Sequence, residues 1–210
     1  MVQRLLDVIA SKPVIWNTFR AIAEAGFHAD YAVIQRELNP FGGNPERTFL
    51  DFGCGTGQFA SCFPADRYDG FDVAPHYVHY AKRHHQRRFC VMSGDYLGYA
   101  NASFDAALIM GVFHHFDDQL VQASVRELHR VLRTGGTVLL IEDIPTQNRW
   151  NILGRAMHWL DRGDNIRSIS HYSTLLQPYF HIERTEHMLS GICDLAVYVL
   201  KRNDTHGAVS

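Results

Sequence analysis

Short strand-like runs alternate with stretches of helical periodicity through the middle of the chain. Five such runs have the length of buried β-strands, at residues 48–50, 68–72, 89–92, 104–110 and 137–141. Ahead of the fifth run, apolar residues recur at helical spacing at Val121, Val125, Leu128 and Leu132. We expect Gly135 to cap that helix at its C-terminus. The alternation predicts βαβ units with right-handed crossovers and a largely parallel sheet.

The two ends of the chain depart from this alternation. Apolar spacing predicts three helices within residues 1–39, the third of them capped by Asp30. Beyond the fifth strand, an amphipathic helix is predicted by the stripe Trp150, Leu153, Met157 and Leu160. A polar loop and a short helix ending at Pro178 follow it. Residues 179–188 and 192–200 then predict an antiparallel pair of strands.

The most distinctive stretch is TFLDFGCGTGQFA, at residues 48–60. Asp51 stands near the carboxyl end of a buried strand and is followed, at alternate positions, by Gly53, Gly55 and Gly57. Chain that turns sharply and lets a ligand approach bare backbone favours residues without a Cβ. A helix starting at about Gln58 would direct its N-terminal amides at such a ligand. The stretch therefore predicts a nucleotide-type cradle.

The spacing of the glycines distinguishes between two kinds of nucleotide. A dinucleotide fingerprint is G-x-G-x-x-G, and here Gln58 stands where its third glycine should be. The pattern D-x-G-x-G-x-G instead resembles motif I of the class I S-adenosylmethionine-dependent methyltransferases. The run LHRVLRTGGTVLLIED, at residues 128–143, is the second most specific resemblance. A nicotinamide oxidoreductase remains the alternative, which both Gln58 and the carboxylate of Asp51 disfavour.

The resemblance covers roughly Arg47–Glu142 and is closest to the subgroup that modifies small molecules such as quinones and natural products. It implies an α/β, Rossmann-like fold with a seven-stranded sheet, mostly parallel with an antiparallel last strand, and helices on both faces. It also implies S-adenosylmethionine as the cofactor. The expected single domain comprises a helical lid (1–40), a cofactor-binding core (47–142), a substrate cap (143–178) and a terminal strand pair (179–202).

Acidic residues at successive strand ends complete the expected cofactor site. Asp72 ends the second strand, where a carboxylate can accept both hydroxyls of a ribose. An Asp before Ala74-Pro75 can also simply begin a helix. The resemblance implies an acid beside the adenine amine and an apolar or aromatic neighbour on the ring, which Asp95 and Tyr96 match. The expected cofactor-binding residues are Asp51, Gly53, Cys54, Gly55, Gly57, Asp72, Val73, Asp95, Tyr96, Met110 and Gly111.

Methyl transfer from a sulfonium is an in-line displacement that depends mainly on holding the nucleophile in place. For a hydroxyl acceptor a general base helps, and His114 and His115, after the fourth strand, could take that proton near neutral pH. We expect His115 to be the better candidate, although a histidine at this position can also serve packing alone. Residues of the cap are expected to shape the substrate pocket, namely Trp150, His171 and Tyr172.

Composition narrows the expected partners. A net charge of −2 without a basic stripe argues against nucleic acid. Where enzymes that methylate adenine amines carry an Asn- or Asp-Pro-Pro-aromatic tetrad, this chain has Met110-Gly111-Val112-Phe113. The histidines of 75–88 lack a matching acid or cysteine, so no metal site is expected. Four cysteines without a C-x-x-C pair, and no apolar run of membrane-spanning length, favour a cytoplasmic protein.

We therefore expect a methyltransferase that acts on a small, partly apolar metabolite. The alternative within the same fold is a protein that binds the cofactor but works as a cyclase or an assembly partner, because a fold does not fix its function.

Overall fold

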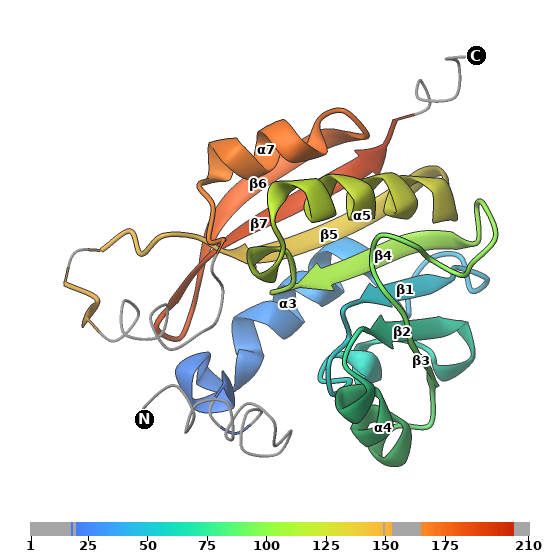
Figure 1. Cartoon of the computed structure of the whole chain (residues 1–210). Helices are drawn as coiled ribbons and strands as arrows, with labels where there is room; N and C mark the ends of the chain where they lie inside the picture. Colours follow the sequence, from blue (N-terminus) through green and yellow to red (C-terminus); the bar gives the residue numbers. More distant parts are fainter. Residues whose placement is uncertain (1–17, 19, 149, 153–164, 204–210) are drawn as a thin grey trace.

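A computed structural model describes residues 18, 20–148, 150–152 and 165–203. A seven-stranded sheet runs through the molecule in the order β3-β2-β1-β4-β5-β7-β6 (Figure 1). Its strands are β1 Phe49–Phe52, β2 Tyr68–Asp72, β3 Arg88–Val91, β4 Phe104–Met110, β5 Leu132–Asp143, β6 Phe180–Ser190 and β7 Cys193–Arg202. The pairings from β3 to β5 are parallel, while β7 runs antiparallel to both β5 and β6. The predicted mostly parallel sheet with an antiparallel last strand is confirmed.

Helices cover both faces of the sheet, as predicted. On one face lie α5 (Asp118–Val131) and α7 (Ile169–Leu176), and on the other lie α3 (His28–Leu38) and α4 (Pro75–His84) (Figure 1). Successive strand residues point to opposite faces, so Leu50 packs in the core under α5 and α7. Its neighbour Phe49 packs in the core under α3 and α4. Because both faces are covered, the central strands consist of nearly continuous apolar residues.

The prediction of a helix starting at about Gln58 is wrong. The chain instead makes a single 3₁₀ turn, η2 (Ala60–Cys62), and a second one, η3 (Ala65–Arg67), before β2. Pro64 explains the difference, since the residue before a proline is driven away from helical geometry. Phe63 is accordingly extended, with φ −118° and ψ 152°. The cradle therefore presents the amides of a loop rather than those of an α-helix N-terminus.

The predictions that Asp30 and Gly135 cap helices are also wrong. Asp30 does not cap α3, which begins at His28; it is buried in the first turn, where its carboxylate accepts a hydrogen bond of 2.7 Å from Ser190 Oγ. Gly135 does not cap α5, because that helix ends at Val131 and the next residue already pairs with β4. Gly135, with φ +71°, lies instead where the register between β4 and β5 shifts. In both places a long-range contact replaced a local cap.

Much of the predicted lid and cap lies outside the described residues. This holds for the first predicted helix and for the stripe from Leu153 to Leu160. The short helix before Pro178 is present as α7, and the 3₁₀ turn η1 (Ala25–Phe27) precedes α3. No helix in the described part of the chain is long and apolar enough to cross a bilayer. The division into lid, core and cap stays a prediction.

Candidate functional site

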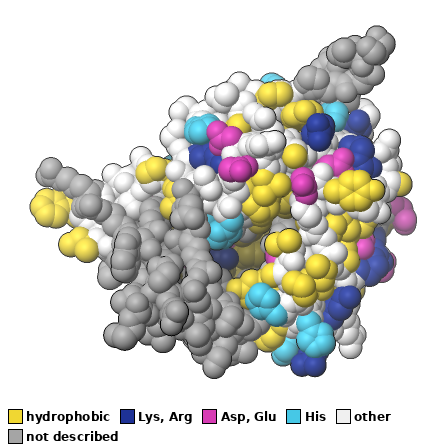
Figure 2. Space-filling view, in the orientation of Figure 1, with side chains coloured by type: hydrophobic (Ala, Val, Ile, Leu, Met, Phe, Trp, Pro, Cys, Tyr) yellow, Lys and Arg dark blue, Asp and Glu magenta, His cyan; other side chains and the backbone are white. Residues whose placement is uncertain are grey.

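A cavity of about 320 Å³ opens at the carboxyl ends of the parallel strands, where open α/β sheets bind their ligands. Figure 2 shows this hollowed face, with hydrophobic and histidine side chains around the hollow. The lining residues come from the loops after β1, β2, β3 and β4, from the end of β5, and from the segment before α3. Its volume lies at the lower end of the range for small-molecule pockets, roughly 300–1,000 Å³.

The glycine loop after β1 forms the floor of the cavity. Gly53 has φ +71°, and a Cβ there would lie 2.5 Å from Cγ2 of Val112, so the close approach of two loops requires glycine. Gly55 has φ +52°, and a Cβ there would meet nothing within 4 Å. Its conformation favours glycine and leaves bare backbone facing open space. Gly57, in contrast, is absent from the lining and packs against His85.

Asp72 joins the two loops that flank the cavity. Its Oδ2 accepts a hydrogen bond from the Gly55 amide at 2.9 Å, and its Oδ1 accepts one from the Ala74 amide at 2.8 Å. Its side chain does not cap α4, whose N-cap is Ala74. Burial raises the pKa of Asp72, while the two backbone hydrogen bonds lower it. Each carboxylate oxygen keeps lone pairs for further donors, such as a pair of ribose hydroxyls.

Asp51 is a buried carboxyl with an unexpected partner. It is 3% exposed, lines the cavity, and accepts a hydrogen bond of 2.6 Å from the hydroxyl of Tyr68. Burial raises the pKa of Asp51 to about 7; the Tyr68 hydrogen bond lowers it and the charge of Asp72 raises it. A cationic ligand would favour the ionised form. Sequence reasoning missed Tyr68, because the contact joins two strands 17 residues apart.

The loop after β4 is organised by Glu142, a fully buried carboxylate at the end of β5. Its oxygens accept hydrogen bonds from the amides of Val112 at 2.9 Å, Phe113 at 2.7 Å and His114 at 3.3 Å. His114 Nδ1 lies 3.0 Å from Glu142 Oε2, within hydrogen-bond distance, so the same carboxyl also holds the ring of His114. Sequence reasoning did not assign Glu142 a role, although it lies in the quoted run LLIED.

Both predicted histidines lie on the cavity wall. His114 is 2% exposed, whereas His115 is exposed to solvent. Their ring centroids are 4.0 Å apart, with the planes inclined by 49°. Met110 and Gly111, at the end of β4, line the cavity beside them, as do Cys54 and the largely exposed Val73.

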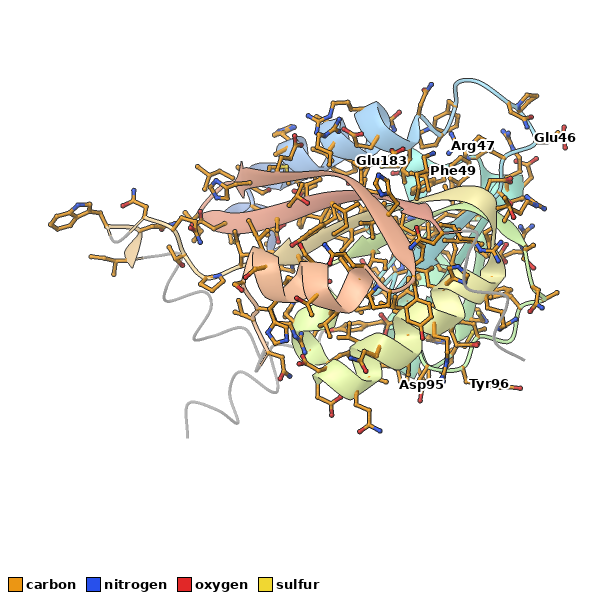
Figure 3. All side chains as sticks on the ribbon, turned by 90° about the horizontal axis from the view of Figure 1, so that it is seen from above. Glu46, Arg47, Phe49, Asp95, Tyr96 and Glu183 are labelled. Atoms are coloured by element: carbon orange, nitrogen blue, oxygen red, sulfur yellow. The ribbon has the colours of Figure 1, made fainter. Side chains whose placement is uncertain are left out.

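The structure does not bring Asp95 and Tyr96 to the cavity. Tyr96 is 78% exposed, and both labelled side chains point away from the body of the molecule in Figure 3. Their turn presents Gly94 inward, because a Cβ at that position would lie 2.5 Å from Cζ of Phe52. Gly94 and Met92 line the cavity in their place.

The three residues predicted to contact the substrate also lie away from the cavity lining. Tyr172 is buried in the core, with the Arg167 guanidinium 5.7 Å from its ring centroid. His171 Nε2 lies within hydrogen-bond distance of Asp118 Oδ2, at 2.8 Å. Trp150 is 74% exposed. Helix α7 buries Tyr172, Leu175 and Leu176 in the core and leaves His171 exposed to solvent.

Residues that the sequence did not single out also line the cavity. Arg20, Glu24 and Phe27 come from the segment before α3, and Asp143 and Cys193 come from the ends of β5 and β7. The i, i+4 spacing of Arg20 and Glu24 is a usable signal, since oppositely charged residues at that spacing pair on a helix. Over the described residues, no three His, Cys, Asp or Glu side chains gather closely enough to hold a metal ion.

Comparison with known proteins identifies the core of the chain. Residues 50–140 match the family model described as a methyltransferase domain. The malonyl-[acyl-carrier protein] O-methyltransferase of Hahella chejuensis is 32% identical over 124 residues, which cover 56% of this chain and 43% of that protein. The acetylserotonin O-methyltransferase of Bos taurus is 30% identical over 115 residues, which cover 51% of this chain and 33% of that protein. The chain thus matches less than half the length of these relatives.

A solved structure shows that the likeness extends to the fold. The PH0226 protein of Pyrococcus horikoshii superposes with a TM-score of 0.66 at 16% sequence identity, over 85% of this chain and 92% of that one. Together with the family match, this confirms the predicted resemblance and the Rossmann-like fold.

Proposed function

We propose that this chain, whose residues 50–140 match a methyltransferase domain, transfers a methyl group from S-adenosylmethionine to a small, partly apolar molecule in the cytoplasm. The observation that carries the proposal is the cavity itself. It brings together bare glycine backbone, two carboxylates, Asp51 and Asp72, and further aromatic, histidine and acidic side chains.

The residues present fit this cofactor. Gly55 leaves open space where a side chain would stand, which suits the approach of a ligand to the backbone. The buried Asp51 lacks a cationic partner within the described structure, and the ammonium group of the cofactor would supply one. Asp72 would accept the ribose hydroxyls, and Met92 and Gly94 would border the adenine. When bound, the cofactor supplies an electrophilic methyl group on a sulfonium.

The protein's own contribution is to hold the acceptor in line with that methyl group and to exclude water. Glu142 fixes the loop from Val112 to His114, and thereby the cavity wall after β4. His115, which the sequence predicts as a base, and His114 beside it belong to this wall. Both curated relatives carry O-methyltransferase in their names, which supports an oxygen acceptor.

Calorimetric titration with S-adenosylhomocysteine and with NAD tests the cofactor. We expect micromolar binding of the first and none of the second. Asp72→Asn should weaken S-adenosylhomocysteine binding by roughly 10- to 100-fold, because a hydrogen bond to a charged group contributes about 1.5–3 kcal/mol. Asp69→Asn is the matched control, since this acid lies on the same strand but pairs with Arg88 outside the cavity. Micromolar binding of NAD alone would overturn the proposal.

Incubation with labelled cofactor and candidate acceptors separates methyl transfer from its alternative. Release of S-adenosylhomocysteine in step with a methylated product supports a transferase. A cyclase or assembly partner would bind the cofactor and release none.

A further inference from the structure

The segment before α3 brings a carboxylate to the cavity from outside the methyltransferase domain match. Arg20, Glu24 and Phe27 line the cavity together, whereas the family match begins only at residue 50. Asp51 and Asp72 are assigned above to the cofactor, so Glu24 and Asp143 are the carboxylates left for the acceptor. Of these two, Glu24 has a geometry that favours proton transfer.

Only one of the two carboxylate oxygens of Glu24 is engaged. Arg20 directs both Nε and Nη2 at Oε1, each at 2.7 Å. Oε2 is buried and has no hydrogen-bond partner within the described part of the chain. The residue is only 4% exposed, so solvent does not replace that partner. A buried carboxylate oxygen without a donor is costly, so such an atom calls for a ligand that supplies a hydrogen. A hydroxyl group of an acceptor in the cavity would do so.

The position of Glu24 is enforced by the turn between β6 and β7. The Ala23 carbonyl accepts a hydrogen bond of 2.9 Å from the Ile192 amide, and the Glu24 carbonyl accepts one of 3.2 Å from Ser190 Oγ. A Cβ on Gly191 would lie 2.0 Å from the Ala23 carbonyl oxygen, so only glycine permits this approach. The hairpin thus fixes the backbone on which Glu24 stands.

The backbone directly after Glu24 is strained. Ala25, Gly26 and Phe27 have φ values of +49°, +71° and +60°, a region that residues with a side chain rarely adopt. For Ala25 and Phe27 this conformation is strained, and such strain persists where the surrounding structure holds it, often at functional sites. Here it turns the chain so that Glu24 and Phe27 both line the cavity.

Burial, together with the charges nearby, places the ionisation of Glu24 in the physiological range. Burial raises the pKa of Glu24 to about 7; the guanidinium of Arg20 lowers it, and the nearby acids Asp30 and Asp143 raise it. A general base works best when its pKa lies near the working pH, because it is then both available and basic enough. Arg20 is the single Lys or Arg of the lining among the described residues, and Glu24 already engages it.

We propose that Glu24 is the proton acceptor of the methyl transfer and that the acceptor is a neutral hydroxyl compound; this rests on the function proposed above. An oxygen lone pair of the acceptor forms the new bond to the methyl carbon. The carbon–sulfur bond breaks, and its electron pair stays on the sulfur of the S-adenosylhomocysteine product. The hydroxyl proton passes to Oε2 of Glu24. A carboxylate acceptor is disfavoured, because Glu24 and Asp143 would repel it.

This assigns to Glu24 the role that the sequence predicted for His115. His115 is exposed to solvent, and His114 is held by Glu142, with Asp143 Oδ2 at 3.7 Å from the same nitrogen. A buried carboxylate with a free oxygen is shielded from competing water, unlike an exposed imidazole.

The test compares the wild type with Glu24→Gln, His115→Ala and the exposed control Glu183→Gln, which is labelled in Figure 3. Binding of S-adenosylhomocysteine is measured by calorimetry, and methyl transfer to phenol and to benzoate is measured against pH. The carboxyl of Glu24 is titrated by carbon-13 NMR, with Glu24→Gln supplying the assignment. Should Glu24→Gln fail to fold, Glu24→Asp replaces it.

We expect all variants to bind S-adenosylhomocysteine within about twofold of the wild type. Glu24→Gln should lose transfer to phenol by roughly 10²–10³-fold, as expected for removal of a general base, while His115→Ala retains the pH profile. The Glu24 carboxyl should titrate near neutrality, and phenol should shift its midpoint.

Transfer within threefold of wild type in Glu24→Gln, or a preference for benzoate, would overturn the role of Glu24 while leaving the methyltransferase function intact. If neither acceptor is methylated, the titration decides: a midpoint below pH 5.5, or one that phenol leaves unmoved, contradicts the proposal. Failure of the wild type to bind S-adenosylhomocysteine would instead refute the proposed function, and the role of Glu24 with it.

Discussion

Asp51 should make the stability of the ligand-free protein fall as the pH rises. Its pKa is about 7 in the folded protein against 3.8 for an ordinary Asp, with burial as the main cause. Between pH 4 and 7 the folded state therefore keeps a proton that the unfolded state has lost. Stability decreases across this window and becomes level above it. A difference of about three pKa units sets an upper limit of about 4 kcal/mol on the stability lost across this window.

Asp51→Asn should remove this dependence. The Asn carbonyl can still accept the Tyr68 hydrogen bond, while its amide hydrogens enter a buried place at a cost of about 1–3 kcal/mol. That cost is the same at every pH. The test is therefore how the free energy of unfolding changes with pH, and not its value at one pH. Urea unfolding at pH 5, 6, 7 and 8 should show that the stability of Asp51→Asn relative to wild type rises with pH. Glu24 contributes a slope of the same sign, which this variant keeps.

The same substitution should weaken S-adenosylhomocysteine binding, since it removes the charge that would face the ligand's ammonium group. A weakening of roughly 10-fold corresponds to about 1.4 kcal/mol. Asp69→Asn, on the neighbouring strand and away from the cavity, is the control and should leave the binding unchanged. Equal pH slopes in wild type and Asp51→Asn would refute the assignment of a raised pKa to this carboxyl.

Two glycine substitutions provide further tests. Gly55→Ala and the control Gly43→Ala both place a Cβ in open space at positive φ, so each should cost about 1 kcal/mol of stability; only the first should abolish S-adenosylhomocysteine binding, by calorimetry. Equal binding by both would show that the cradle does not hold the ligand. Gly191→Ala should destabilise the protein by more than about 2 kcal/mol, because the new Cβ would overlap the Ala23 carbonyl. In the control Gly135→Ala the new Cβ contacts no other atom, so this variant should lose only the energy of a strained φ. Thermal unfolding compares the two, and equal losses would contradict the enforced contact with the segment that carries Glu24.

Local sequence patterns were sufficient to predict most strands of the sheet. The runs predicted at 68–72 and 104–110 coincide with β2 and β4. The run of β4 is nearly continuous in apolar residues because that strand is buried on both faces. Errors arose where a distant contact replaced a local signal. Asp30 binds Ser190 instead of capping a helix, and Leu132 joins the sheet before Gly135 can end α5.

The cofactor side of the site was more accessible to sequence reasoning than the acceptor side. Gly53, Gly55, Asp51 and Asp72 lie within one βαβ-like unit, so their proximity follows from short connections. The orientation of the turn at Asp95 was not predictable in this way, because the packing of Gly94 against Phe52 decides which side faces inward.

The amino-acid sequence by itself determined the strands, their largely parallel arrangement and the glycine cradle, since these depend on periodicity and on the conformational freedom of a few residues. Tertiary structure alone decided the surroundings of the buried carboxyls. Tyr68 meets Asp51, Glu142 holds the loop before His115, and the hairpin at Gly191 fixes the segment of Glu24. The ionisation of a buried group depends on what desolvates it and which charges lie beside it, and residues far apart in the chain supply both.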